Sequence, residues 1–471
     1  MVIHFGTSGW RARIAEEFTF ANVRRAVTAI AAWLHETGAA RRGVYVGYDT
    51  RFLSERFAAI AASTLADHRV PAVLSPTPVP TPAVAWAIVS GRRAGGVNIT
   101  ASHNPPAWNG LKFSTHRGAP APPGITRRIE ELAAHPAGPG AVPADASAGG
   151  PARRSAVRTH DIRQAYFKQL SGLVRLRAIR RARLRIACDL RHGASIGFLD
   201  GILRHATSSL KPIHDRPHPE FGGLGPDCGE TQLAELARLV RRSRLHLGLA
   251  TDGDGDRFGI VDRGGHFLPP NLFLALLADY LLEERRVKGG VGRTVATTHL
   301  IDAVCAYHGR PVFETPVGFK FLGEHLLSRR AFLACEESAG MSVAGHVPEK
   351  DGILAGLLAA EMVAVRRKPL RDQVRDLFRK VGPLHSRRID YHTDPAGRDR
   401  LARRLEEIPS TMAGRRIVRF DTTDGRKMVF EDGAWLLLRP SGTEPLIRCY
   451  AEARVPRDLD SLLAAARALM Q

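Results

Sequence analysis

Three stretches of the chain repeat one order of hydrophobic and polar positions. Each has an apolar, β-branched run, a polar loop, an amphipathic stretch with helical spacing, and a second apolar run that ends in a Pro- or Gly-bearing turn. The first runs lie at residues 44–51, 184–189 and 294–298, and the three stretches close near residues 75–78, 215–219 and 314–318. Strands that alternate with helices predict βαβ units with a partly parallel sheet. The pattern therefore predicts three similar mixed-sheet α/β domains.

The remaining segments interrupt this order. Pro, Ala and Gly dominate residues 117–155 around one short helix at 125–135, a composition typical of a domain boundary with a flexible tail. After about Arg379 the strands become shorter, at 387–390, 416–420 and 435–439, and a helix at 459–470 follows, which predicts a smaller C-terminal α+β domain. We expect domains at 1–140, 156–258, 259–376 and 385–471, around a central cleft.

Length and composition agree with several domains. A chain of 471 residues and 51.4 kDa exceeds what one hydrophobic core usually supports. No apolar run approaches the roughly 18 residues of a membrane span, and the first residues carry no secretion signal, so we expect a cytoplasmic protein without a membrane partner. The five Cys form no Cys-x-x-Cys pair and are expected to be reduced, mostly buried thiols.

The formal net charge of +21 raises the question of nucleic acid. Basic residues are spread through every segment, however, and the runs at 175–185 and 238–244 resemble solvated faces, with only 7% aromatic residues in the chain. Basicity alone supplies non-specific, salt-sensitive attraction. We therefore expect no specific nucleic-acid partner, and a field that attracts a small dianionic substrate.

Two short loops carry the strongest chemical signal. One, Thr100-Ala101-Ser102-His103-Asn104-Pro105, offers a hydroxyl after an apolar strand; the other, residues 252–257, places Asp at 252, 254 and 256. Alternating carboxylates at a turn favour a hard cation such as Mg²⁺ or Ca²⁺. The pattern disfavours an EF-hand, because Arg257 and Arg263 stand where its Gly and Glu are required, whereas an Arg suits a phosphate. A metal beside a serine suggests phosphoryl chemistry.

Other loops are weaker signals. Residues 439–443 follow an apolar strand and predict an anion-binding nest, and residues 335–340 present carboxylates and a hydroxyl that could hold sugar hydroxyls. Residues 289–294 resemble a phosphate loop but lack its first Gly and its Lys, and Phe258 replaces the third Gly of a dinucleotide fingerprint. Nucleotide binding is therefore not expected, and no His or Cys spacing predicts zinc.

In this order the loops resemble those of the α-D-phosphohexomutase superfamily, in its bacterial phosphoglucomutase/phosphomannomutase branch. The resemblance covers nearly the whole chain and rests on residues 5–11, 100–105, 109–113, 252–257, 315–320, 336–338, 348–352 and 439–445. It implies three similar α/β domains and a C-terminal domain related to the TATA-binding-protein fold. Ser8, Ala12 and Cys335 depart from the usual pattern without removing a named catalytic group.

The resemblance also implies roles for individual residues. Ser102 would be carried as phosphoserine, and Asp252, Asp254 and Asp256 would hold Mg²⁺ together with that phosphate. Arg11, Lys112 and Arg257 would flank the phosphoserine, and either Lys112 or His103 is the candidate for proton transfer. The implied substrate-binding residues are Gly318, Lys320, Glu336, Ser338, Lys350, Arg439, Ser441, Gly442, Thr443 and Arg448.

The implied reaction moves phosphate between O1 and O6 of a hexose through a hexose 1,6-bisphosphate, which also serves as activator. Gly340 lies where some mannose-accepting relatives place His, which favours glucose over mannose. The alternatives are a phosphoglucosamine mutase and a non-catalytic phosphosugar-binding protein. The expected partner is a small phosphosugar, and the expected assembly is a monomer or a homodimer.

Overall fold

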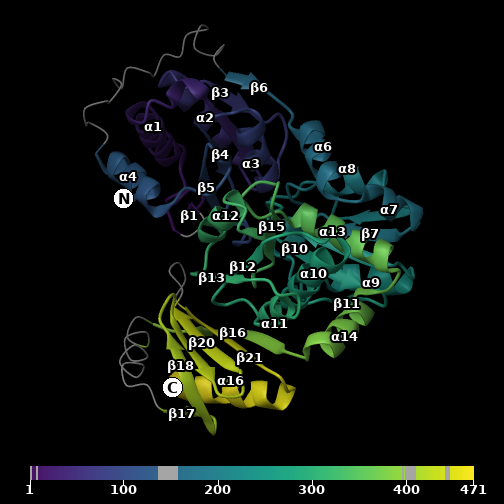
Figure 1. The fold of residues 1–471 in the computed structure, drawn as a ribbon. Coiled ribbons are helices and arrows are strands. Elements are labelled where there is room, and N and C mark those ends of the chain that lie inside the picture. The colour runs from purple at the N-terminus through teal and green to yellow at the C-terminus, as the bar shows by residue number, and fades with distance from the viewer. Residues whose placement is uncertain are drawn as a thin grey trace. The chain divides into compact units, whose positions relative to one another are not determined.

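The computed structural model describes residues 3–6, 9–135, 157–394, 397, 410–440 and 446–470. The chain forms two compact units: unit 1 comprises Met1–Pro269 and Ser338–Leu370, and unit 2 comprises Pro270–Glu337 and Arg371–Gln471. Figure 1 labels their helices and strands. α/β sheets precede an antiparallel C-terminal sheet, which confirms the predicted fold class.

The first sheet of unit 1 has the strand order β1-β5-β4-β2-β3-β6 and is mixed, since β1, β5 and β4 pair antiparallel and the others parallel. Helices α1, α2 and α4 share one core with the side of β2 that carries Val44 and Val46. Helix α3 covers the other side, where a Cβ on Gly47 would lie 2.4 Å from Val84. The strands are Trp10–Arg13, Val44–Tyr48, Ala72–Leu74, Gly95–Ile99, Trp108–Thr115 and Val157–Thr159, and the helices are Phe20–Glu36, Ser54–Asp67, Thr81–Ser90 and Pro123–Ala134.

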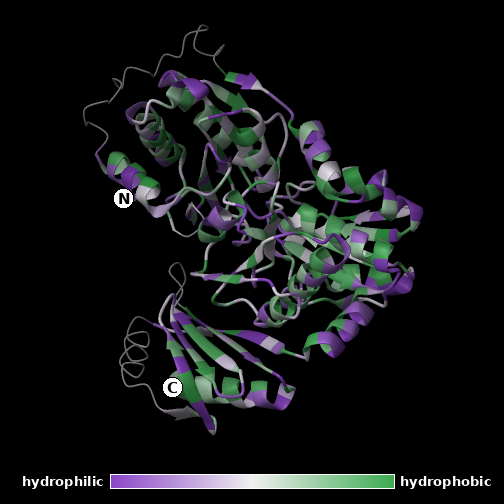
Figure 2. Ribbon diagram, viewed as in Figure 1, coloured by the Kyte–Doolittle hydropathy of each residue, from purple (hydrophilic) through white to green (hydrophobic). Residues whose placement is uncertain are grey.

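The second sheet of unit 1 has the order β11-β10-β9-β7-β8 and is also mixed. Helix α9 packs on the side that carries Ala250, and α13, about a hundred residues later in the chain, packs on β9 and β10 near Leu249. The strands β7 to β11 are Arg185–Asp189, Ser209–Ile213, Leu247–Thr251, Phe258–Asp262 and His266–Phe267; β15 is Gly340–Val343; helices α6 to α9 and α13 are Arg163–Leu173, Leu176–Arg181, Leu199–Arg204, Ala234–Arg242 and Gly352–Arg366. Figure 2 shows both hydrophobic and hydrophilic residues along the outer helices, as this packing requires.

Unit 2 contains β12, which pairs parallel with β13 and β14, and the C-terminal antiparallel sheet of order β16-β21-β20-β19-β18-β17. Helix α16 packs its leucines on one face of that sheet. The strands β12 to β14 are Gly290–Thr294, Val312–Thr315 and Ala331–Glu336, and β16 to β21 are His385–His392, Thr411–Met412, Arg415–Asp421, Arg426–Phe430, Trp435–Pro440 and Leu446–Ala453. The helices are Pro270–Glu284 (α10), Leu300–Tyr307 (α11), Phe319–Leu327 (α12), Leu370–Val381 (α14) and Pro456–Met470 (α16).

One predicted strand is wrong. Residues 294–298 were expected to open the third α/β repeat, but the strand there is β12, Gly290–Thr294, and residues after Thr294 form the turn toward α11. The glycines that suggested a loop are required by packing, because a Cβ on Gly290 would lie 2.1 Å from the carbonyl oxygen of Pro311. The segment at 289–294 that resembles a phosphate loop is therefore largely the buried strand β12.

The helix predicted in the boundary segment and three predicted C-terminal strands are confirmed. The helix expected at 125–135 is α4, and the strands expected at 387–390, 416–420 and 435–439 are β16, β18 and β20. All five Cys are buried and free. Most of the boundary segment at 117–155 lies outside the described residues. Within the described part of the chain, no helix is both long and apolar enough to cross a membrane.

Candidate active site

Ser102 lies in the loop that follows β4 and is 1% exposed. Its backbone is left-handed, with φ of 53°, a conformation that non-glycine residues rarely adopt. The Oγ atom lies 3.1 Å from Asp252 Oδ2 and 3.4 Å from His103 Nδ1. The predicted nucleophile therefore faces the predicted metal loop within unit 1, although the two are 150 residues apart in the sequence.

The three predicted aspartates occupy the turn between β9 and β10, and both strands are fully buried. Asp252, Asp254 and Asp256 are each at most 1% exposed, and a ligand oxygen from each lies within 4.8 Å of the others. Burial raises the pKa of Asp252 well above its usual value, and the charges of Asp254 and Asp256 raise it further. Three buried carboxylates this close require cations around them.

Two lysines supply part of that positive charge. Lys112, on β5, places Nζ 2.6 Å from Asp254 Oδ2 and 3.0 Å from Asp256 Oδ2, and Lys350 places Nζ 3.2 Å from Asp256 Oδ2. Burial alone would lower the pKa of Lys112, but the two carboxylates outweigh it and raise that pKa above its ordinary value. Both lysine side chains are therefore held against the aspartate loop.

The other predicted residues of unit 1 surround the same loops. The Arg257 backbone N–H donates to Asp252 Oδ1 at 3.0 Å, and Arg11 on β1 donates to Asn104 in the serine loop at 2.6 Å. Burial lowers the pKa of Arg11 to about 10. Burial, together with the charges of Arg257 and Arg11, also holds the pKa of His103 well below its usual value, so this imidazole is neutral.

The aspartate loop fits a hard divalent cation. Asp254 Oδ1 and Asp256 Oδ1 are buried and have no hydrogen-bond partner among the described residues, and the Ser102 hydroxyl adds a further oxygen beside Asp252. Mg²⁺ prefers such oxygen ligands, usually one or two carboxylates together with phosphate oxygens. We conclude that the residues present suit Mg²⁺, with Ser102 at its edge.

Unit 2 brings together a second group of the predicted residues. The Gly318 N–H donates to Glu336 Oε1 at 3.0 Å, and Glu336, at the end of β14, is buried. Lys320 lies nearby on α12, its Nζ 5.3 Å from the ring centre of Phe321, and burial lowers its pKa. The loop expected to hold sugar hydroxyls therefore does place a carboxylate against a backbone N–H.

The predicted phosphate-binding loop is only partly described. Arg439 on β20 stands directly opposite Arg448 on β21, and Arg439 Nε lies 2.9 Å from Asp424 Oδ1. Ser441, Gly442 and Thr443 lie outside the described residues. Ser338, described in the turn before β15, begins the second segment of unit 1.

Sequence reasoning missed residues that act through distant contacts. Thr81 donates its hydroxyl to Asp254 Oδ2 at 2.6 Å and its N–H to the Asp254 carbonyl at 2.9 Å. Asp424, in the turn between β18 and β19, accepts the Val317 N–H at 2.9 Å in addition to pairing with Arg439. Of these two residues, only Thr81 has a local signal in the sequence, which is the run of prolines before it.

Comparisons with known proteins identify the family of the chain. The phosphoglucomutase/phosphomannomutase family matches through all four of its domain models: alpha/beta/alpha domain I at residues 2–137, domain II at 164–265, domain III at 269–381 and the C-terminal domain at 395–469. The chain belongs to this family, within the α-D-phosphohexomutases. It is a phosphohexomutase, an intramolecular phosphotransferase.

Individual relatives cover nearly the whole chain. A phosphoglucomutase from Komagataeibacter xylinus is 31% identical over 96% of this chain and 87% of its own length, and a phosphoglucomutase/phosphomannomutase from Thermococcus kodakarensis is 29% identical over 96% and 94%. A crystal structure assigned to a phosphomannomutase of Thermus thermophilus superimposes with a TM-score of 0.86 at 35% identity, covering 100% of this chain and 99% of the other.

Proposed function

We propose that this phosphohexomutase is Mg²⁺-dependent and converts glucose 1-phosphate to glucose 6-phosphate, with Ser102 as its phosphorylated residue. The observation that carries the proposal is the 3.1 Å approach of Ser102 Oγ to Asp252 Oδ2, beside oxygens of Asp254 and Asp256 that accept no hydrogen bond within the described part of the chain. A hydroxyl at the edge of an oxygen-ligand metal site is suited to phosphoryl transfer, because the catalyst's main task is to place and neutralise phosphoryl oxygens.

The cycle has two balanced steps. In the first, the bond from phosphorus to Ser102 Oγ breaks as a bond to O6 of glucose 1-phosphate forms, and the O6 hydroxyl proton ends on Ser102 Oγ. In the second, the phosphoryl group on O1 of the glucose 1,6-bisphosphate returns to Ser102 Oγ, whose proton ends on O1. A bound Mg²⁺ would neutralise charge on the transferring group. Lys112 and His103 both remain candidates for carrying the proton.

The remaining residues are assigned to substrate binding. Glu336 and Gly318, which contact each other, and Lys320 are assigned to the sugar together with Ser338. Lys350 is assigned to the substrate beside the aspartate loop. The phosphate that is not transferred is assigned to Arg439, Arg448, Ser441, Gly442 and Thr443. The four domains are proposed at 1–140, 156–258, 259–376 and 385–471.

The preferred sugar is the finer part of the proposal. Glucose is favoured because Gly340 replaces the His of some mannose-accepting relatives. Phosphoglucosamine mutase is the second candidate, since an enzyme of that description from Ectopseudomonas mendocina is 28% identical over 95% of this chain. Glucose 1,6-bisphosphate is proposed as both intermediate and activator.

The central test is phosphorylation of Ser102. After incubation with glucose 1,6-bisphosphate, the intact mass of the wild-type protein is expected to show one added phosphoryl group. Mass spectrometry of a digest is expected to locate this group on a peptide that contains Ser102. Ser102→Ala is expected to abolish both the mass shift and turnover. Ser114→Ala, a substitution of the same kind at a buried serine of β5, is the matched control and should keep both.

Competition among glucose, mannose and glucosamine 1-phosphates then settles the sugar. The proposal expects the highest kcat/KM for glucose 1-phosphate, with Mg²⁺ required and chelation abolishing turnover. Preference for glucosamine 1-phosphate would replace the substrate but keep the mechanism. Binding of all three without turnover would instead identify a non-catalytic phosphosugar-binding protein.

A further inference from the structure

The left-handed conformation of Ser102 is held by two buried residues outside the metal loop. The Ser102 N–H donates to Thr100 Oγ1 at 2.9 Å, and the Ser102 carbonyl accepts from an Arg51 guanidinium nitrogen at 2.6 Å. An L-residue in this region of backbone space is strained, so such contacts must fix it from both sides. The two contacts therefore hold the peptide groups on both sides of Ser102 in place.

Thr100 and Arg51 both donate hydrogen bonds to the carboxylate of Asp49. Thr100 Oγ1 donates to Asp49 Oδ2 at 2.5 Å, and Arg51 Nε donates to that oxygen at 3.1 Å. The other oxygen, Oδ1, accepts the Arg51 N–H at 3.0 Å and the Ser54 hydroxyl at 2.8 Å. The side chains of Asp49 and Arg51 are fully buried, so solvent and salt screen this ion pair much less than a surface pair.

Arg51 also fixes the rest of the serine loop. Its guanidinium donates to the carbonyls of Asn104, Pro105 and Trp108 at 2.6, 2.8 and 2.9 Å, in addition to that of Ser102. A planar guanidinium is suited to this task because its donors point in fixed directions, which an ammonium does not provide. Movement of the loop would break several charge-assisted hydrogen bonds at once.

A similar Asp–Arg pair supports the aspartate loop in the second domain. There the Arg191 N–H donates to Asp189 Oδ1 at 2.9 Å, and the Arg191 side chain donates to the carbonyls of Gly225 and Asp227. Pro226, between them, accepts the N–H of Gly253 in the aspartate loop at 2.9 Å. Each of the two facing loops is therefore supported by a buried Asp-x-Arg pair at the C-terminal end of β2 or β7.

We propose that Asp49 and Arg51 are positioning residues for phosphoryl transfer, which hold Ser102 in its left-handed conformation and its hydroxyl against the aspartate loop. The inference rests on the proposed function of Ser102. Arg51 acts through the backbone and touches no reacting atom. Since a misplacement of about 1 Å can cost about 100-fold in rate, loss of the support should lower kcat while substrate binding is retained.

The primary variant is Thr100→Val, which keeps the side-chain shape and removes the hydroxyl between Asp49 and Ser102. We expect kcat and the single-turnover rate of Ser102 phosphorylation by glucose 1,6-bisphosphate to fall about 100-fold, with KM within about twofold of wild type. Arg51→Lys keeps the charge and should likewise lower kcat while KM stays nearly unchanged. The phosphorylation rate is followed by intact mass, well below the melting temperature.

Tyr45→Phe is the matched control for stability. It removes a hydroxyl on β2 of the same domain that donates to the His160 carbonyl at 2.9 Å and also interacts with Ser75. We expect it to lower the melting temperature as much as Thr100→Val does and to leave kcat unchanged. If both variants lower kcat equally, or if Thr100→Val keeps kcat within twofold, the positioning inference is overturned.

Failure of the inference is separable from failure of the proposed function. If wild-type protein gains no phosphoryl group at Ser102 and Ser102→Ala still turns over, the function assigned to Ser102 is wrong and the inference falls with it. If the wild type is phosphorylated and Thr100→Val reacts at the wild-type rate, Ser102 keeps its role and only the positioning role of Asp49 and Arg51 is overturned.

Discussion

At the scale of single residues, Gly352 fixes the distance between α13 and the aspartate loop. A Cβ on Gly352 would lie 2.1 Å from the Arg257 carbonyl oxygen, and the Gly352 N–H donates to the Gly255 carbonyl at 3.1 Å. Gly352→Ala must therefore push the loop away, at a cost of about 1–3 kcal/mol in stability. We expect the Mg²⁺ affinity and kcat/KM to fall at least about tenfold, measured by calorimetry and steady-state kinetics.

Gly356→Ala, one turn later on the same helix, is the matched control. The nearest side-chain atom to its added Cβ would lie 3.6 Å away, in ordinary contact. Because alanine is a better helix former than glycine by about 0.5–1 kcal/mol, this variant should raise the melting temperature slightly and keep the Mg²⁺ affinity. Equal losses in both variants would contradict the explanation from the close approach at Gly352.

Residues whose chemistry is local could be predicted from the sequence, and residues that act across the fold could not. Ser102 and the aspartate triplet stand at turns after apolar strands, where hydroxyl and carboxylate groups carry their own signal. Thr81 reaches Asp254 from 173 positions away, and Arg51 reaches Ser102 from 51 positions away. Only the folded chain brings such pairs into contact, so a single sequence contains no pattern for them.

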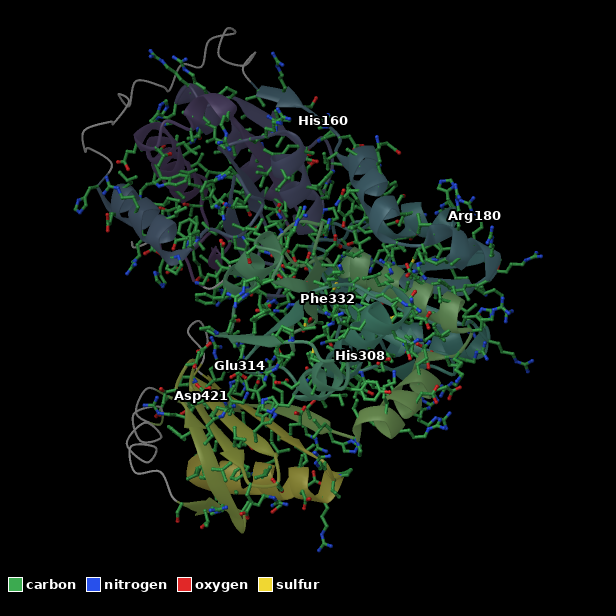
Figure 3. The ribbon with its side chains drawn as sticks, in the orientation of Figure 1. His160, Arg180, His308, Glu314, Phe332 and Asp421 are labelled. Carbon is green, nitrogen blue, oxygen red and sulfur yellow. The ribbon has the colours of Figure 1, made fainter. Side chains whose placement is uncertain are left out.

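At the scale of elements, Lys427 joins β19 of the C-terminal sheet to the end of β12 and to β13. Its Nζ donates to the Val295 carbonyl at 2.7 Å and lies 3.1 Å from Glu314, which is labelled in Figure 3, and 3.0 Å from His299. Burial, together with the positive charge of Arg293, lowers the pKa of Lys427 to about 8. Glu314 partly offsets this effect.

This lowered pKa predicts a pH dependence of stability. Between about pH 8 and 10.5 the unfolded chain binds more protons at this lysine than the folded chain, so the free energy of unfolding rises with pH in that window. The upper limit is about 1.4 kcal/mol per pH unit. Thermal unfolding of wild type and Lys427→Met should show a wild-type advantage that grows from pH 8 to 10. Parallel curves would rule out the shifted pKa.

The elements themselves were largely predictable, while their partners were not. The apolar runs correctly predicted β2, β7 and β20, because each side of these strands has a consistent environment. The strand β12 was misplaced because Gly290 and Gly292 resemble a loop. The packing of α13 on the second sheet depends on chain connectivity across about a hundred residues, which hydrophobic periodicity does not contain.

At the scale of the whole molecule, the formal charge of +21 is carried partly by exposed arginines of unit 1. Arg180 on α7, labelled in Figure 3, and Arg238, Arg241 and Arg242 on α9 are exposed. The helix positions expected from the sequence to be solvated faces are therefore solvated. Together they contribute to a long-range positive field, which salt screens: the Debye length is about 30 Å at 0.01 M and about 8 Å at 0.15 M.

This field should assist the capture of a dianionic hexose phosphate. We expect kcat/KM to fall several-fold between about 10 and 150 mM NaCl while kcat stays nearly constant, because screening weakens the encounter and not the chemistry.

Residues that contact phosphate directly would produce the same trend, so the surface contribution needs its own variant. Changing Arg238, Arg241 and Arg242 to Gln lowers the formal charge by three, from +21 to +18. This triple variant should have a lower kcat/KM at low salt and a shallower salt dependence, whereas the corresponding Lys variant, which keeps the charge, should match wild type. A Gln variant indistinguishable from the Lys variant at 10 mM NaCl would show that these arginines play no part in drawing the substrate to the enzyme.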